Sequence, residues 1–291
     1  MHPAPSIIFF TVFSGLGFGM LMFLGLGKPD VSGFTAFVFF AIAYILAVGG
    51  LISSTFHLGN PQRALKAFTQ WRTSWLSREG CLAVLTLTVM AIYGAGLVFW
   101  NVRIGLLGLL GSLLSLLTVI GTSMIYTQIK TVPRWHHWTT PLIFVGYALT
   151  GGAMLTNQLH LAIPLLMAIG ILQLAAWVIG DKRFAEEGST IETATGLGHI
   201  GKVRMFEAPH SSKNYLMKEM VHVIGRKHAS KLRIMGSLLL SLLPLLLLLV
   251  VGASHMTVLL AMVMHIAGAL TTRWLFFAEA EHTVGLYYGQ R

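Results

Sequence analysis

Long runs of apolar residues recur along the chain, and polar segments separate them. A helix needs about 20 apolar residues in a row to cross the hydrocarbon core of a bilayer. Eight runs approach or reach this length, so we predict an all-α polytopic membrane protein with eight transmembrane helices in one bundle. The predicted spans are Ile7–Leu26, Phe34–Thr55, Gly80–Trp100, Ile104–Tyr126, Thr139–Leu155, Leu161–Ile179, Ile234–Val251 and Thr257–Phe277.

An even number of spans places both ends of the chain on the same side of the membrane. On this prediction residues 1–291 form a single membrane domain. The side with the termini also carries the longer connections, which are segments 56–79, 127–138 and 180–233. The other side carries only tight turns, so all the elaborate extramembrane sequence lies on one side.

Segment 180–233 is the only sizeable extramembrane connection, and part of it has an amphipathic pattern. Ser212 is placed to cap a helix that runs to about Lys227, with apolar side chains on one face. Basic side chains surround that face, namely Lys213, Lys218, Arg226 and Lys227. Such a helix lies on the membrane surface or docks a partner subunit, and a solvated loop is the alternative.

Composition excludes a soluble protein and gives the predicted bundle an orientation. Hydrophobic residues make up 55% of the chain and charged residues only 10%, against about 25% charged in a typical soluble domain. The net charge is +10, from 20 Lys and Arg against 10 Asp and Glu. Only Lys28 and Arg103 among the basic residues lie on the side of the tight turns, so by the positive-inside rule the other side, with both termini, is cytoplasmic. The basic excess is therefore read as sidedness rather than as a nucleic-acid partner.

The metal-ligating residues of the chain do not favour a bound redox metal. The single cysteine, Cys81, rules out a cluster held by several cysteines of this chain. Of the 12 histidines, only His265 lies deep in a predicted span, and no second histidine lies at its depth to complete a haem site. We therefore expect neither haem nor an iron–sulfur cluster. We expect His265 to bond a Ser or Thr of a neighbouring helix, with a role in a proton path as the minority alternative.

Polar and aromatic side chains gather at the cytoplasmic ends of several predicted spans, and this mixture suits a quinone. The quinone ring needs flat apolar walls, its carbonyl groups need donors, and its reduction needs two protons. His57 is the best candidate for the proton donor or acceptor. Arg78, Arg273 or Tyr126 is placed to bond a carbonyl group, and Glu79 to orient Arg78 or His57.

Each of these residues also has a purely structural explanation. Aromatic residues at span ends are often interfacial anchors. His57 is placed to end a helix, where a cation is favourable, and Arg78 with Glu79 is placed to form a surface pair. Arg273 is harder to explain in this way, because an arginine inside a span usually has a partner.

Four motifs resemble the membrane anchor of dimethyl-sulfoxide-reductase-type molybdoenzymes. They follow in the family's order along the chain: His57-Leu-Gly-Asn-Pro-Gln-Arg-Ala64, Ser74-Trp-Leu-Ser-Arg-Glu79, Tyr126-Thr-Gln-Ile-Lys-Thr-Val-Pro-Arg-Trp135, and Arg273 followed by His282-Thr-Val-Gly285. The resemblance implies His57 as the quinone-reactive residue. The quinone-binding residues that we predict are His57, Arg63, Ser74, Arg78, Glu79, Tyr126 and Arg273.

The resemblance implies a complex in the bacterial inner membrane with two partners, a molybdopterin catalytic subunit and a four-cluster, ferredoxin-like iron–sulfur subunit. The anchor then exchanges electrons with ubiquinone or menaquinone. The basic segment 180–233 looks more like the anchors of cytoplasmic sulfite dehydrogenases, which favours sulfite oxidation with quinone reduction. A dimethyl sulfoxide reductase anchor that oxidises menaquinol is the alternative, and a secondary transporter is the alternative of another class.

Overall fold

The computed structural model describes residues 1–56, 60–207, 212, 214–221 and 227–289. These residues form helices and connections and contain no strand, which confirms the predicted all-helical fold. Seven helical stretches are long and apolar enough to cross a membrane. They are α1–η1–α2 (Pro5–Phe9, Phe10–Ser14, Gly15–Gly25), α3 (Gly33–Thr55), α4 (Trp75–Phe99), α5 (Gly105–Thr127), α7 (Leu159–Glu186), α10–η4–α11–η5 (Ala229–Ser237, Leu238–Leu242, Leu243–Leu246, Leu247–Val251) and α12 (His255–Ala278).

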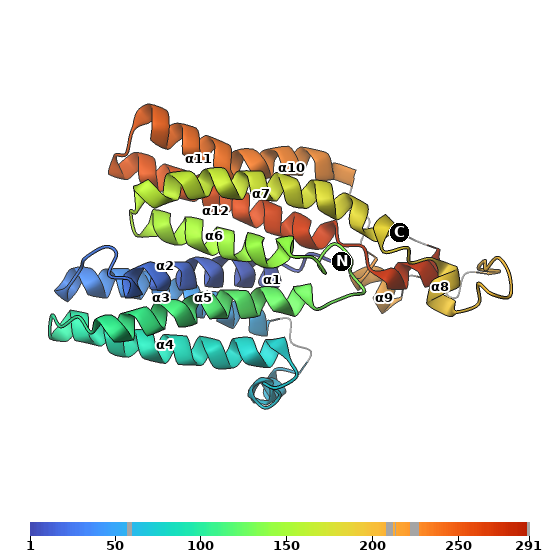
Figure 1. Ribbon diagram of the computed structural model, residues 1–291, viewed down its shortest axis with the longest axis horizontal. Coiled ribbons are helices and arrows are strands. Elements are labelled where there is room, and N and C mark those ends of the chain that lie inside the picture. The colour runs from blue at the N-terminus through green and yellow to red at the C-terminus, as the bar shows by residue number, and fades with distance from the viewer. Residues whose placement is uncertain (57–59, 208–211, 213, 222–226, 290–291) are drawn as a thin grey trace.

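An eighth apolar helix, α6 (Thr139–Leu155), is shorter than these seven. It packs between α2 and α7 and runs alongside them in the bundle (Figure 1). That it forms the eighth membrane span stays a prediction. The two ends of the chain lie at the same end of the bundle (Figure 1), and which side of the membrane this end faces also stays a prediction.

The first helical stretch is the centre of the bundle. Its α2 part contacts α3, α5 and α6, and it is the most buried of the candidate spans. Small residues permit this close packing. A Cβ atom at Gly19 would lie only 1.9 Å from the carbonyl oxygen of Ala148 in α6, so the two backbones touch there, as small residues commonly allow in membrane helices.

Two helices extend beyond the spans that the apolar pattern predicts. Helix α4 begins at Trp75, five residues before the predicted start at Gly80, and α7 ends at Glu186 rather than at Ile179. The extra turns contain charged residues, such as the pair Arg183–Glu186 at 3.3 Å. Hydropathy marks where lipid begins, whereas the helical hydrogen bonds continue into the polar layer.

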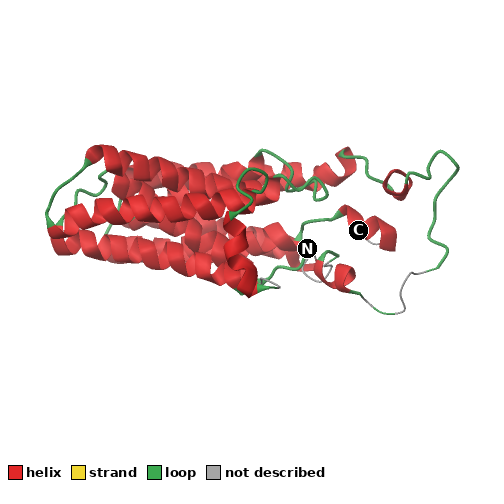
Figure 2. Cartoon of the chain, turned by 90° about the horizontal axis from the view of Figure 1, so that it is seen from below, coloured by secondary structure: helices red, strands yellow, loops and turns green. Residues whose placement is uncertain are grey.

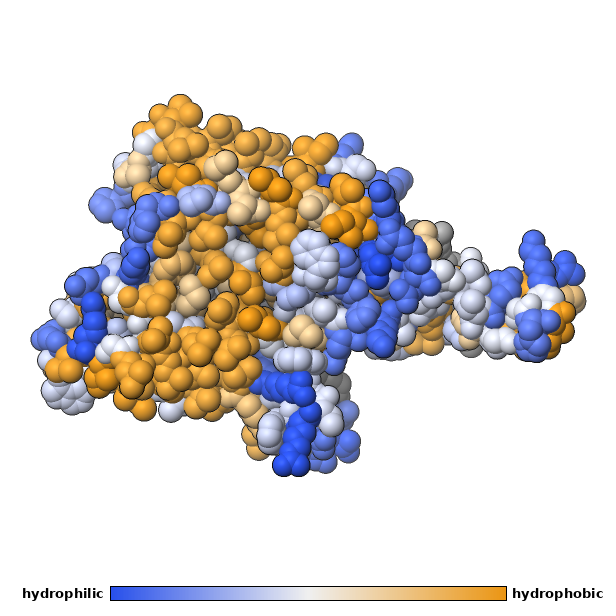
Figure 3. Space-filling view, in the orientation of Figure 1, coloured by the Kyte–Doolittle hydropathy of each residue, from blue (hydrophilic) through white to orange (hydrophobic). Residues whose placement is uncertain are grey.

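Beyond the bundle, the chain forms an arm from four short parts (Figures 1 and 2). These are helix α8 (Ile191–Thr195), the loop 196–207, helix α9 (Tyr215–Glu219) and the 3₁₀ helix η6 (Thr283–Tyr288). Figure 3 shows an apolar surface over the helices of the bundle and a hydrophilic surface at the end that carries the arm. This division of the surface agrees with a multi-pass membrane protein.

The helix predicted from Ser212 to Lys227 is wrong in extent. The structure has a single helical turn and a half, α9, and the cap is Asn214, whose side chain accepts a bond from the backbone N–H of Met217 at 2.9 Å. The helix ends at Glu219, and Val221 is already outside it. Five residues are too few for the continuous amphipathic face that the sequence pattern indicates.

Candidate functional site

A groove lies on the outer surface of the bundle where α4 begins. It has a volume of about 490 Å³ and is lined by Trp71, Trp75, Arg78, Cys81, Leu82 and Leu85. Trp71 and Leu85 are exposed, so the groove opens outward. A mostly aromatic and aliphatic wall with one charged group is typical of a small-molecule site.

The guanidinium group of Arg78 is fixed at this groove. Its Nε donates to the backbone carbonyl of Trp71 at 2.9 Å, and Nη2 donates to that of Arg72 at 2.6 Å. The guanidinium carbon also lies 4.4 Å from the centre of the Trp75 ring, which is a cation–π distance. A cation held beside an aromatic wall is suited to donate to a carbonyl oxygen of a flat ring.

The 3₁₀ helix η2 (Pro61–Phe68) packs against the start of α4 and carries Arg63. The hydroxyl of Ser77 donates to the carbonyl of Ala67. The Phe68 ring is close enough to lie 3.2 Å from a Cβ atom at Gly80, so a glycine is needed there. Ser74 directly precedes α4, and its carbonyl accepts the Arg78 backbone N–H at 3.0 Å. Arg63 and Ser74 therefore belong to the segments that frame the first turn of α4.

Glu79 faces the interior of the bundle instead of the groove. It is 4% exposed, and the Thr122 hydroxyl of α5 donates to its Oε1 at 2.6 Å. The sequence allows an ion pair between Arg78 and Glu79, but the structure gives each of them other partners, because neighbouring residues point about 100° apart around a helix. A carboxyl group buried in this way needs a donor, and Thr122 is that donor.

Tyr126 lies in an aromatic cluster inside the bundle. Its ring centre is 5.4–5.6 Å from those of four other rings, which belong to Trp135, Phe144, Phe276 and Phe277. The Trp135 indole donates to the carbonyl of Phe276 at 2.9 Å and so ties the connection before α6 to α12. This environment places Tyr126 in the core and away from the groove.

Arg273 of α12 is the most deeply buried charged residue that we predicted. It is 1% exposed, and its guanidinium carbon stacks 3.6 Å from the centre of the Phe144 ring. Its Nε and Nη1 have no hydrogen-bond partner among the described residues. An ionisable group of this kind inside a membrane span is a functional candidate by default.

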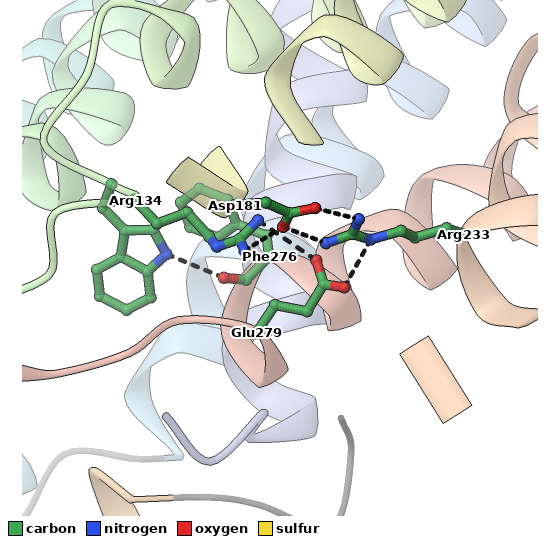
Figure 4. Close-up of polar contacts among 6 residues, drawn as sticks. Arg134, Asp181, Arg233, Phe276 and Glu279 are labelled. Atoms are coloured by element: carbon green, nitrogen blue, oxygen red, sulfur yellow. Dashed lines mark hydrogen bonds and ion pairs between the residues drawn. The ribbon is translucent and has the colours of Figure 1, made fainter. Parts of the chain in front are cut away.

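An ion-pair cluster lies at the end of the bundle next to the arm (Figure 4). Asp181 of α7 accepts bonds of 2.6 Å from both Arg134 and Arg233. Glu279, which directly follows α12, accepts a 2.7 Å bond from Arg233 and lies 3.6 Å from Arg134. The sequence placed Arg134 and Glu279 at this depth but did not single out Asp181 or Arg233. The signal for them was the rarity of acidic residues, since each acid at a span end calls for a partner.

His265 is buried at the middle of α12, but its partner differs from the one we expected. Its Nδ1 lies 2.7 Å from the backbone carbonyl of Leu240, not from a Ser or Thr side chain. Leu240 belongs to the π-helical turn η4. The wider turn interrupts the regular ladder of helical hydrogen bonds and frees carbonyl groups for such contacts.

The predicted quinone residues thus fall into two groups. Arg63, Ser74 and Arg78 lie around the outer start of α4, whereas Glu79, Tyr126 and Arg273 lie inside the bundle. His57 lies outside the described residues. Of the predicted docking residues, Lys213 and Arg226 also lie outside them, while Lys227 is exposed and Lys218 is in the last turn of α9. Within the described ranges, no group of three or more His, Cys, Asp or Glu side chains is placed to hold a metal ion.

Two comparisons with known proteins give the same family. The family model of the DMSO reductase anchor subunit (DmsC) matches residues 1–289. The third subunit, designated C, of the sulfite dehydrogenase of Allochromatium vinosum is 31% identical over 325 aligned residues, which cover 99% of each chain. No solved structure matches the chain.

Proposed function

The chain belongs to the DMSO reductase anchor subunit family, and from this premise we propose that it is the quinone-reactive subunit of a molybdoenzyme complex. In this proposal the anchor lies in the bacterial inner membrane and passes electrons between the quinone pool and an iron–sulfur subunit. A separate molybdopterin subunit performs the chemistry on the terminal substrate. Membrane attachment as an anchor subunit follows from the family itself.

The groove at the start of α4 carries this proposal. Its volume of about 490 Å³ is within the usual range for a small-molecule site, about 300–1,000 Å³. Trp71 and Trp75 supply flat walls, and Arg78 supplies a fixed donor for one carbonyl oxygen. The groove opens on the outer surface of the bundle, where a quinone arrives from the lipid. His57 supplies or accepts a proton, as its motif implies.

Electron flow from sulfite to quinone is the direction that we propose. The curated relative that aligns over nearly the whole chain is a sulfite dehydrogenase subunit, which favours sulfite as the electron donor. The alternative, oxidation of menaquinol by a dimethyl sulfoxide reductase complex, uses the same groove and rests on the family description. Assays of the complex with sulfite and quinone, or with quinol and dimethyl sulfoxide, distinguish the two.

A pair of nearby arginines tests the groove. Replacing Arg78 by Gln removes the fixed cation, and a charge-assisted hydrogen bond contributes about 1.5–3 kcal/mol. We therefore expect the KM for quinone of the complete complex to rise at least about tenfold, with electron transfer to an artificial dye unchanged. Arg72→Gln is the control, because the Arg72 side chain does not line the groove.

His57→Ala extends the same test to the proton step. This variant should lose quinone-linked turnover and keep both assembly and dye-linked activity. Equal loss of the two activities in His57→Ala would make His57 structural. Unchanged quinone kinetics in both Arg78→Gln and His57→Ala would leave a purely structural anchor, without the quinone function that we propose.

The arm is the proposed docking surface for the iron–sulfur subunit. It exposes large apolar side chains beyond the membrane-embedded bundle (Figure 3), including Phe206 at 96% exposure, Ile200 and Tyr215. Apolar side chains exposed to water in this way mark protein interfaces. Exposed basic residues, among them Lys202, lie on the same arm. A partner surface with apolar side chains and surrounding carboxylates fits this combination.

Removing basic charge from the arm tests the docking surface. Replacing Lys213, Lys218, Arg226 and Lys227 together by Gln should weaken retention of the iron–sulfur subunit in membranes, because rim charges steer and orient association. Phe206→Ser should weaken it further by removing apolar contact. Subunit retention in salt-washed membranes measures both. Full retention in both variants would place the docking surface elsewhere.

A further inference from the structure

Two small cavities lie inside the bundle, away from the groove. The first, which we call the interface cavity, has a volume of about 30 Å³, and its wall includes Arg134, Gln173, Thr272, Arg273 and Glu279. The second, the central cavity, has a volume of about 10 Å³, and its wall includes Thr11, Ser14, Thr122 and His265. Tyr147 of α6 lines both cavities.

Buried polar atoms without partners belong to the walls of both cavities. Arg273, in the interface cavity, has two such nitrogens, and His265, in the central cavity, has its Nε2. Both side chains are at most 1% exposed. A buried polar group left unpaired costs about 1–3 kcal/mol. A polar cavity of at least about 10–15 Å³ accommodates a water molecule that satisfies such groups. The interface cavity therefore has room for about two water molecules and the central cavity for about one.

Hydrogen bonds between the described side chains connect the two cavities to Glu79. The Tyr147 hydroxyl is bonded to Gln173 at 2.6 Å and to Thr272 at 2.7 Å. In the central cavity, Thr122 donates to Glu79 at 2.6 Å. Polar groups thus continue from Glu279 at the end of the bundle to Glu79 beside the first turn of α4.

Glu79 is also suited to serve the groove. Residues three and four apart lie on the same face of a helix, so Glu79 shares a face with Trp75 and Leu82, both of which line the groove. The carboxyl group itself is buried and points toward α5. It therefore needs an internal supply of protons if it is to act more than once.

We propose that the two cavities bind a chain of water molecules, and that Glu79 exchanges protons with the aqueous side through this chain and Tyr147. The proton step rests on the proposed quinone function. During quinone reduction, electrons come from the iron–sulfur subunit, and Glu79 gives one proton to a quinone oxygen. The carboxylate regains a proton through Thr122 and the water chain. Bulk water refills the chain at the Arg134–Glu279 end.

Arg273 determines how a proton moves along this chain. A fixed positive charge repels a free hydronium ion, as arginines do in water channels. The same charge stabilises a missing proton, which carries negative charge, as it moves outward from Glu79. The water chain then transfers a proton when Glu79 has given one up and otherwise stays closed to free hydronium.

Radiolytic hydroxyl-radical footprinting of the intact complex tests the water chain without any quinone. Water bound beside a buried side chain is expected to generate radicals there, so Tyr147 and His265 should become oxidised on X-ray exposure. Met20 is the internal control, because it is 1% exposed and lines neither cavity. Labelling of Tyr147 and His265 no greater than that of Met20 would overturn the proposal, whatever the quinone assays show.

Tyr147→Phe tests the proton path. Positioned proton transfer contributes at least about a hundredfold in many enzymes, so we expect quinone-linked turnover to fall at least tenfold, with a changed solvent isotope effect and unchanged dye-linked activity. Tyr44→Phe is the matched control, since the Tyr44 hydroxyl bonds the carbonyl of Leu87 and lines neither cavity. Wild-type turnover and isotope effect in Tyr147→Phe would overturn the path while leaving quinone binding intact. If that variant does not assemble, the wild-type footprint decides.

Discussion

Arg78 and Glu79 are neighbours in the chain but face different surroundings. Arg78 lies on the outer groove with Trp75, whereas Glu79 is buried against Thr122 of the next helix. The sequence predicted the depth of both residues, because depth follows from distance along an apolar run. It did not predict which face each occupies, since that depends on which helices pack together. For the same reason Arg273, at a similar depth, lies in the core and not at the groove.

Thr122→Val tests the interior role of Glu79 at the residue scale. The substitution keeps the shape of the side chain and removes the donor to the carboxyl group, which should cost about 1–3 kcal/mol. We expect a lower melting temperature of the purified protein in detergent. Thr88→Val is the control, because the exposed Thr88 hydroxyl bonds only the carbonyl of Val84 in its own helix. Equal melting temperatures for the two variants would mean that Thr122 does not stabilise Glu79.

At the scale of elements, apolar runs predicted the existence of the helices well and their ends poorly. The extra first turn of α4 contains Arg78 and Glu79, and the extra turns of α7 contain Asp181. Both extensions are in the polar layer, where hydropathy carries no signal for helix. The short α9 shows the opposite error, since an amphipathic pattern alone does not form a helix when Asn214 caps a single turn and a half.

The ion-pair cluster should hold three helices together at the end that carries the arm. Glu279→Gln removes an acceptor shared by Arg134 and Arg233. Breaking a buried pair costs about 3–5 kcal/mol, and the partial exposure of both arginines lowers this toward the surface value of about 1 kcal/mol. We expect a lower melting temperature and faster proteolysis near α10.

The exposed pair Arg183–Glu186 supplies the control for this cluster. Glu186→Gln breaks an ion pair on the surface of α7, where the acid is 53% exposed, so the melting temperature should stay within about a degree of the wild type. If Glu279→Gln is equally silent, the cluster does not fasten α7, α10 and α12.

At the scale of the whole molecule, one end of the bundle carries nearly all the polar sequence. The groove, the ion-pair cluster and the arm all lie toward this end. The net charge of +10 therefore reports a sided molecule. This arrangement places a quinone site and a partner surface at the same end, which is what direct electron transfer between them requires. The sequence predicted this sidedness because counting charges between spans needs no knowledge of packing.

Photolabelling with an azido-quinone tests the quinone site most directly. The complete complex, in native membranes, is illuminated with the probe, and the labelled peptides are identified by mass spectrometry. We predict label within residues 71–85, displaced by excess unmodified quinone and reduced in Arg78→Gln. Label that is absent, or that excess quinone does not displace, or that lies wholly at another part of the bundle would contradict a quinone site in this groove.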